Sequence, residues 1–243
     1  LAVFKDRIID EVVREIAGWL RHDYGYVRAA AVKALAVFKD RVPEEVINDI
    51  AGRLRDDDEY VRATAVEALA KLEHRLPEEV INDIAGWLRD NDEDVRAAAV
   101  EALAKLEHRL PEEVINDIAG RLRDVDWMVR AAAVEAQAKL GDRVPGEAIK
   151  DFAGRLRDDE WYVREAAVEA LAVFKDRLPE EAIKDIAGWL RDDDSDVRAA
   201  AVKALAVFKD RLPEEVIKDI AARLRDDDWR VRAAAVKVLA VFK

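Results

Sequence analysis

The chain has 243 residues, of which 51% are hydrophobic and 39% charged, and its formal net charge is −12. It has no cysteine, which excludes disulfide bridges and thiolate zinc sites. We expect neither a signal peptide nor a membrane segment, because no stretch approaches ~20 apolar residues. The negative net charge argues against a protein whose main function is to bind the phosphate backbone of a nucleic acid. We expect a cytoplasmic, all-α protein.

A 34-residue period organises the chain. Its six prolines recur at this spacing, at Pro43, Pro77, Pro111, Pro145, Pro179 and Pro213. The period predicts one repeat domain over residues 1–243, with repeats at 6–39, 40–73, 74–107, 108–141, 142–175, 176–209 and 210–243. Positions 1–34 below count from the first residue of each repeat. Residues 1–5 match the end of a repeat, so we expect the chain to be a piece of a longer array.

Each repeat reads as two helices joined by an acidic turn. Positions 4–16 have an apolar stripe and a proline that we place at the first helical position. Positions 17–19 form the turn, and the Asp at position 19 is the expected N-cap of a second helix over positions 20–33. Tyr24 and Glu160 replace that Asp in two repeats, where we expect weaker caps. Since two helices cannot bury these faces alone, the repeats should stack into a right-handed α-solenoid.

Two near-invariant features have structural interpretations. Arg at positions 16 and 23 is matched by Asp at positions 10 and 17–19, which predicts ion pairs between neighbouring repeats. Gly at position 13 of six repeats costs ~1 kcal/mol relative to Ala, so we expect a closely packed neighbouring helix there.

The recurring Asp-x-x-Val-Arg, as in Asp58-x-x-Val61-Arg62 and Asp228-x-x-Val231-Arg232, precedes an Ala-rich helix and resembles HEAT repeats over the whole chain. The run LPEEVIxDIAxRLxDxDxxVRxAAVxAL looks more specifically like arrays behind the nucleotide-binding domain of NACHT-type STAND ATPases, which are NLR-like receptors. That resemblance implies the ligand-sensing region of a receptor. Engineered repeat scaffolds look similar, and a designed protein is an alternative.

Sequence variation is concentrated on one stripe of the second helix, at positions 20, 21, 24, 28 and 32, which we call the variable stripe. A helical wheel places it opposite the core, and by resemblance to HEAT arrays it should line the concave surface. Exposed Trp and Tyr anchor interfaces, whereas neutral drift explains them poorly. The candidate partner-binding residues are Tyr26, Glu59, Tyr60, Asp94, Trp127, Met128, Trp161, Tyr162, Glu165, Asp196, Trp229 and Arg230.

Tryptophan follows a second pattern. Trp occurs at position 20 only where position 14 is Arg, as in Arg155 with Trp161, which suggests that the two positions share one aromatic slot. If that slot is filled internally, some of these tryptophans are structural. Coincidence among seven copies is the alternative.

No catalytic, cofactor or metal motif is present, so we expect no enzyme, no cofactor and no metal. The favoured function is binding of a protein or peptide with a basic or mixed apolar surface. Over positions 20, 21, 24 and 28, repeats 2–5 are acidic, repeat 6 is neutral and repeat 7 is basic. A structural spacer without ligand is the main alternative, and nucleic-acid binding is less favoured. Uncapped terminal repeats could also associate end to end.

Overall fold

The computed structural model describes residues 2–72 and 75–240, with side chains from residue 8 onward. In this part the chain forms fourteen α-helices and no β-strand, which confirms the predicted all-α repeat fold. None of these helices has the length and low charge needed to cross a bilayer. Two compact units, Leu1–Arg121 and Leu122–Lys243, divide the chain.

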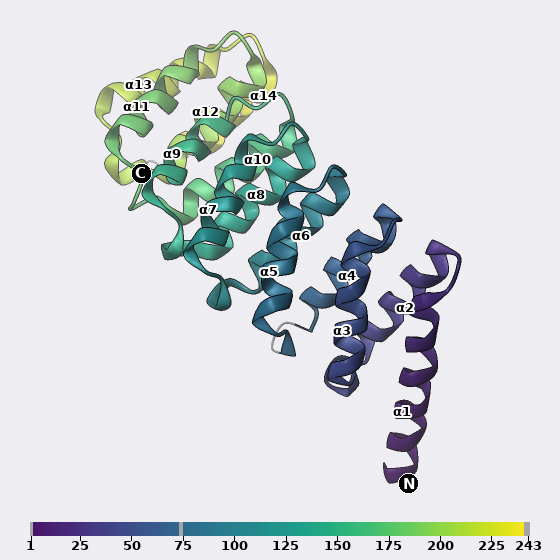
Figure 1. Cartoon of the computed structure of the whole chain (residues 1–243). Helices are drawn as coiled ribbons and strands as arrows, with labels where there is room; N and C mark the ends of the chain where they lie inside the picture. Colours follow the sequence, from purple (N-terminus) through teal and green to yellow (C-terminus); the bar gives the residue numbers. More distant parts are fainter. Residues whose placement is uncertain (1, 73–74, 241–243) are drawn as a thin grey trace. The chain divides into compact units, whose positions relative to one another are not determined.

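Each repeat supplies a first helix, here the A-helix, with an odd number, and a second or B-helix with an even number (Figure 1). The first unit contains α1 (Ala2–Gly18), α2 (Gly25–Val37), α3 (Glu44–Gly52), α4 (Glu59–Ala70), α5 (Glu78–Gly86), α6 (Glu93–Lys105) and α7 (Glu112–Gly120). The second contains α8 (Trp127–Leu140), α9 (Gly146–Arg155), α10 (Trp161–Val173), α11 (Glu180–Gly188), α12 (Ser195–Val207), α13 (Glu214–Ala222) and α14 (Trp229–Leu239).

B-helices form the most extensive packing in each unit. In the first unit α4 packs between α2 and α6, and in the second α10 and α12 lie between α8 and α14. Each B-helix buries an Ala at position 26, and most also bury a Val at position 22 and a Leu at position 30. Val61, Ala65 and Leu69 of α4, for example, are fully buried. These apolar positions recur every three or four residues, so one face of the helix meets the core.

Proline lies one residue earlier in the A-helices than predicted. Pro43 has an extended ψ of 152° and is the N-cap of α3, so the helix begins at Glu44. The first repeat carries Ile9 instead of proline. Here α1 runs without a break from Ala2 to Gly18, because Ile9 retains its N–H and no pyrrolidine ring interrupts the helix.

The predicted caps of the B-helices are confirmed. Asp side chains at position 19 accept hydrogen bonds from backbone N–H groups of the first turn; Asp58 accepts from Val61 at 3.2 Å, and Asp228 from Arg230 at 2.7 Å. Neither Tyr24 nor Glu160 provides a side-chain cap, as predicted.

The explanation for Gly at position 13 is wrong. A Cβ atom added at Gly18, Gly52, Gly86, Gly120, Gly154 or Gly188 would meet nothing within 4 Å. The backbone there is ordinary right-handed helix; at Gly52, for example, φ is −58° and ψ −25°. No close helix contact therefore requires these glycines.

Candidate interaction surface

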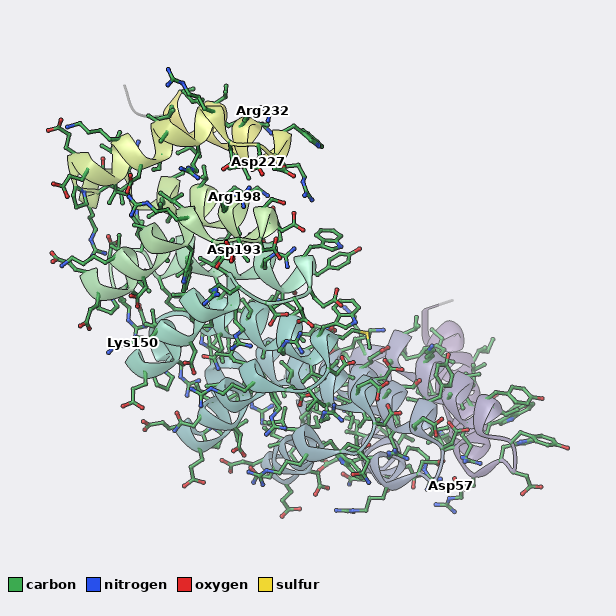
Figure 2. The ribbon with its side chains drawn as sticks, turned by 90° about the horizontal axis from the view of Figure 1, so that it is seen from above. Asp57, Lys150, Asp193, Arg198, Asp227 and Arg232 are labelled. Atoms are coloured by element: carbon green, nitrogen blue, oxygen red, sulfur yellow. The ribbon has the colours of Figure 1, made fainter. Side chains whose placement is uncertain are left out.

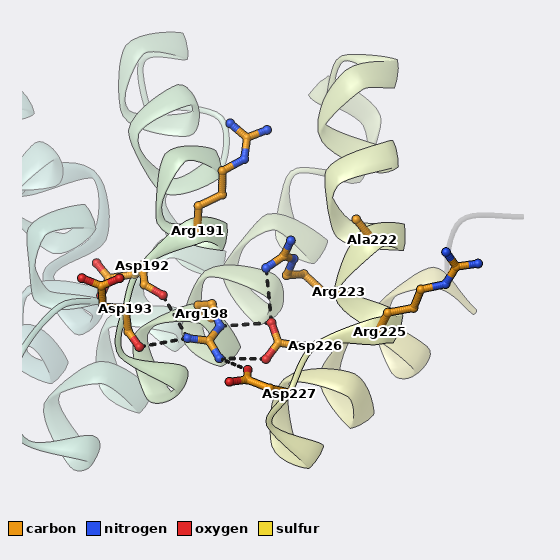
Figure 3. A pocket seen from close by; sticks show the side chains of 9 residues that line it. All are labelled: Arg191, Asp192, Asp193, Arg198, Ala222, Arg223, Arg225, Asp226 and Asp227. Atoms are coloured by element: carbon orange, nitrogen blue, oxygen red, sulfur yellow. Dashed lines mark hydrogen bonds and ion pairs between the residues drawn. The ribbon is translucent and has the colours of Figure 1, made fainter.

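The arginine at position 23, which recurs in all seven repeats, closes the turn between the two helices. Its Nη1 atom donates to the carbonyl oxygens of positions 17 and 18 of its own repeat, as Arg198 does to Asp192 and Asp193 at 2.9 and 3.0 Å. The remaining nitrogens reach the next repeat, where Nε and Nη2 of Arg198 bind both oxygens of Asp226 (Figure 3). This arginine therefore ties the turn to its neighbour, as the matched charges predicted.

A second ladder joins position 16 to position 10 of the next repeat. Arg55 pairs with Asp83 at 3.0 Å in the first unit, and Arg191 with Asp219 at 2.9 Å in the second. Each series of ion pairs, here called a ladder, connects residues that are 28 apart in the sequence. The paired positions, 16 with 10 and 23 with 17, differ by six, and the partner lies one 34-residue repeat further on. Figure 2 shows Asp193, Arg198, Asp227 and Arg232 following one another across the last two repeats.

Position 14 belongs to this network. In three repeats its guanidinium contacts the Asp at position 17, so that carboxylate lies between two arginines. Arg223 donates to Asp226 at 3.3 Å, and Arg53 and Arg155 make the same contact. Where position 14 is Trp87, the Arg62 guanidinium lies 5.9 Å from the ring centroid and reaches Asp90 through one nitrogen at 3.2 Å. Position 14 therefore takes part in contacts between repeats, and the proposed slot shared with position 20 stays a prediction.

The charge network shifts the pKa of its carboxylates. Burial raises the pKa of Asp226, but hydrogen bonds from Arg198 and from the Asp228 N–H outweigh burial and lower it to about 2. The pKa values of Asp56 and Asp158 are lowered by the same balance, with Arg28 and Arg130 as the arginine partners. The turns therefore keep their charge at neutral pH and act structurally.

Every predicted binding residue on the variable stripe is exposed or half-buried. In the second unit, Trp161, Tyr162 and Trp229 are 55%, 51% and 68% exposed. Trp127, Met128 and Asp196 are half-buried, whereas Glu165 and Arg230 are exposed. In the first unit Tyr26, Glu59, Tyr60 and Asp94 are all exposed. The stripe thus faces solvent along the B-helices of both units.

Three aromatic rings gather at the start of α8 and α10. The Trp127 ring stacks on the Tyr162 ring, with 5.5 Å between the ring centroids. The Trp161 ring also stacks on Tyr162, with 3.6 Å between the centroids. Residues at position 20 of one repeat and position 21 of the next are therefore adjacent. We call Trp127, Trp161 and Tyr162 the aromatic cluster; sequence spacing alone did not reveal it.

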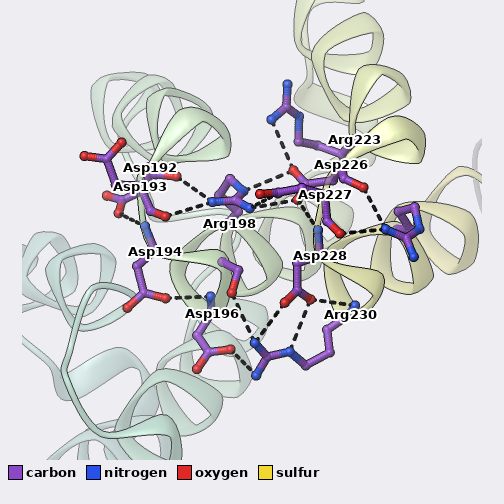
Figure 4. Close-up of polar contacts among 12 residues, drawn as sticks. Asp192, Asp193, Asp194, Asp196, Arg198, Arg223, Asp226, Asp227, Asp228 and Arg230 are labelled. Carbon is purple, nitrogen blue, oxygen red and sulfur yellow. Dashed lines mark hydrogen bonds and ion pairs between the residues drawn. The ribbon is translucent and has the colours of Figure 1, made fainter.

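Charged side chains continue the stripe beside this cluster. Lys203 of α12 pairs with Glu165 of α10 at 2.8 Å. Arg230 of α14 pairs with Asp196 at 2.5 Å and with Asp228, as Figure 4 shows. Asp228 holds the pKa of Arg230 above its usual value, with Asp196 contributing. A recess of about 350 Å³ lies among these side chains, with Trp161 on its wall and Ala199 and Ala200 among its lining.

The first unit has fewer contacts along the stripe. Lys33 donates to the Tyr60 hydroxyl at 2.7 Å and lies 4.7 Å from its ring centroid. Position 20 of the first repeat is a special case, because a Cβ on Gly25 would lie 2.1 Å from the Asp58 carboxylate. Part of the variation on the stripe therefore reflects packing between repeats.

Another recess, of about 380 Å³, lies beside Tyr26 and is lined by apolar groups that include Trp19, Val27 and Ala30. The counterparts of Ala30 at position 25, such as Ala98 and Ala132, are buried. This recess therefore exposes a surface of the first repeat whose counterparts in later repeats are buried, and of its lining only Tyr26 belongs to the variable stripe. Among the described residues, no cluster of three or more His, Asp or Glu side chains could hold a metal ion.

Comparison with known proteins supports the repeat architecture. A family model described as HEAT repeats matches residues 13–104, 84–172 and 149–240. No curated protein sequence matches the chain. A solved structure of Kap95p bound to RanGDP shares 15% identity and a TM-score of 0.78 over 95% of this chain and 34% of its own.

Two further structures are similar. Importin beta has 14% identity and a TM-score of 0.70 over 93% of this chain and 35% of its own. A designed armadillo repeat protein in complex with the peptide (KR)4 has 20% identity and a TM-score of 0.50 over 81% of this chain and 99% of its own. The chain thus spans about a third of the two importin-type structures, and these likenesses concern the fold.

Proposed function

Because this chain belongs to the family of HEAT repeats, we propose that it is a scaffold that binds a protein or peptide along its variable stripe. The aromatic cluster carries the proposal. Trp161 and Tyr162 are each about half exposed although the same helix buries Val163, Ala167 and Leu171. Large aromatic side chains held against one another lose little entropy on binding, which is why they anchor interfaces.

The scaffold residues support a binding role over a catalytic one. Among the described residues, the titratable groups with shifted pKa values are the Asp and Arg partners of the ladders, the Arg230 ion pairs and Lys33, which donates to Tyr60. Each has a partner that accounts for its shift. Similar folds also serve binding: the structures named above hold RanGDP in one case and the peptide (KR)4 in another.

The charge of the stripe favours a partner with basic groups. Glu59, Glu67, Asp94 and Glu101 place carboxylates along α4 and α6, and Glu135, Glu165 and Glu169 do so along α8 and α10. The net charge of −12 points the same way and disfavours nucleic acid. A role as the ligand-sensing region of a larger, NLR-like receptor is the finer part of the proposal, and it rests on the sequence resemblance.

A peptide-display selection tests the proposal. The immobilised chain should enrich peptides that bind at least ten-fold more weakly to a Trp127→Ala/Trp161→Ala/Trp229→Ala variant. A control variant, Lys150→Ala/Lys184→Ala, changes exposed side chains of the A-helices α9 and α11 and should retain binding. Circular dichroism would confirm equal helicity in all three proteins.

Two outcomes would reject the binding role. One is failure to enrich any peptide, which would favour a structural spacer or a scaffold without ligand. The other is equal binding of enriched peptides to the parent and the tryptophan variant, which would place the interface elsewhere. Salt-sensitive, tight binding of DNA by the parent would instead favour the nucleic-acid alternative.

A further inference from the structure

Exposed charge changes sign along the variable stripe of the second unit. At positions 20, 21, 24 and 28, the helices α8 and α10 contribute three carboxylates and no cation, at Glu135, Glu165 and Glu169. At the same positions α12 and α14 contribute three cations, Lys203, Arg230 and Lys237, and one carboxylate, Asp196. Six of these side chains are exposed and Asp196 is half-buried, so solvent and any partner meet both signs of charge.

Ion pairs within the stripe make the separation between its negative and positive ends more pronounced. Lys203 pairs with Glu165, and Arg230 with Asp196, which neutralises charges near the middle of the stripe. Within the described part of the chain, Glu135, Glu169 and Lys237 form no ion pair. The remaining charge is therefore negative over α8 and α10 and positive over α14.

The recess beside Trp161 lies between these two ends. Its volume of about 350 Å³ is at the small end of the range for ligand pockets. Ala199 and Ala200 contribute apolar surface, and the exposed Lys203–Glu165 pair lies at its rim. Exposed ion pairs contribute only about 0–1 kcal/mol, so this pair can separate at little cost. The recess therefore fits one large apolar side chain of a partner.

We propose that the second unit selects a polypeptide segment of mixed charge, with Lys or Arg at one end, Asp or Glu at the other and a large apolar residue between them. The basic end lies over α8 and α10, the apolar side chain enters the recess beside Trp161, and the acidic end lies over α14. Packed helices are about 8–10 Å apart, so α10 and α14 are separated by roughly 16–20 Å. An extended chain covers that span with about five or six residues. This inference rests on the proposed function and names its partner.

Three synthetic peptides of equal length, each with a central Trp, test the inference by fluorescence anisotropy. One carries a Lys block and a Glu block at opposite ends, one carries Lys at both ends, and one carries Glu at both ends. The full chain should bind the mixed-charge peptide at least several-fold more tightly than the all-Lys peptide and at least ten-fold more tightly than the all-Glu peptide.

Charge reversal on α12 and α14 gives the decisive comparison. A Lys203→Glu/Lys237→Glu variant should reverse the preference, so that the all-Lys peptide becomes the tightest ligand. Its matched control, Lys150→Glu/Lys184→Glu, makes the same change in net charge on α9 and α11 and should leave the preference unaltered; Lys150 projects from the far margin of the unit in Figure 2.

Several results would overturn the inference while leaving the proposed function intact. In the first, the parent binds the all-Lys peptide as tightly as the mixed-charge peptide. In the second, both charge-reversal variants change their preference equally. In the third, display-selected peptides bind but none of the three synthetic peptides does. Failure of the proposed function is recognised separately, by affinities that do not depend on the three tryptophans.

Discussion

Arg198 holds both carboxylate oxygens of Asp226, with 2.8 Å from Nη2 to Oδ1 and 3.0 Å from Nε to Oδ2. The side chains are 9% and 2% exposed, so this ion pair between the last two repeats is shielded from water. Arg223 adds a third contact to the same carboxylate. The equivalent pairs Arg28–Asp56 and Arg130–Asp158 have the same geometry, so the stacking of repeats depends on a recurring buried pair.

Replacing Asp226 with Asn should lower the free energy of unfolding by about 3 kcal/mol, because it leaves two arginines beside an uncharged group in a buried site. The matched control is Asp219→Asn, which breaks the exposed pair with Arg191, whose side chain is 70% exposed. That change should cost less than about 1 kcal/mol. Urea denaturation at pH 7 measures both, and equal losses would contradict the distinction between buried and exposed ladders.

Acid should weaken the parent more than the Asp226→Asn variant. The folded pKa of Asp226 is about 2, below the unfolded value of about 3.9, so the ionised carboxylate stabilises the fold at neutral pH. That contribution is fully present above about pH 4 and is lost as the pH falls towards 2. Urea midpoints at pH 6, 4 and 2.5 should converge for the two proteins. A constant difference across this range would show that Asp226 does not titrate as described.

Alanine should stabilise the A-helices at position 13. Gly52→Ala and Gly86→Ala should each add about 0.5–1 kcal/mol to the free energy of unfolding, because the added Cβ meets open space and the backbone is helical. Ala222 already occupies this position in the last repeat. Gly25→Ala is the contrasting change and should destabilise, since its Cβ would displace the Asp58 carboxylate. Thermal unfolding of the three variants gives the comparison; stabilisation by Gly25→Ala would be inconsistent with the structure.

The cap of α10 can be completed by Glu160→Asp. The backbone at Glu160, with φ −93° and ψ 127°, already resembles that of Asp58, with φ −89° and ψ 119°, whose side chain caps α4. The shorter carboxylate should reach the first-turn N–H groups and add about 0.5–1 kcal/mol to stability. Guanidinium denaturation tests this, with Asp194→Ala as a control that should lose a similar amount. No gain from Glu160→Asp would mean that the native turn leaves no room for the cap.

Sequence periodicity predicted much of this fold. The proline spacing gave the helix pairs, and Asp at position 19 identified the caps, because both features act within one repeat. The pairing of Arg198 with Asp226 was predicted as a class of contact between repeats. Its bidentate geometry and the contribution of Arg223 were not, since they depend on how repeats stack in space.

One expectation failed for a physical reason that the sequence does not display. Gly at position 13 suggested a close neighbour, but whether a Cβ has space depends on the path of the adjacent helix. The shared slot suggested for positions 14 and 20 stays a prediction, because the contacts described, of Arg62 with Trp87 and of Trp127 with Tyr162 of the next repeat, involve other pairs of positions. The binding role of the variable stripe stays a prediction.

The most direct test of that role is the affinity of one display-selected peptide for the parent and for a Trp161→Ala/Tyr162→Ala variant, measured by isothermal titration calorimetry. Both side chains are exposed, so their removal should leave the melting temperature nearly unchanged. We expect a loss of at least ten-fold in affinity, since truncating central aromatic anchors typically costs about 2 kcal/mol or more, with ~1.4 kcal/mol per factor of ten. An unchanged dissociation constant in an equally stable variant would contradict it.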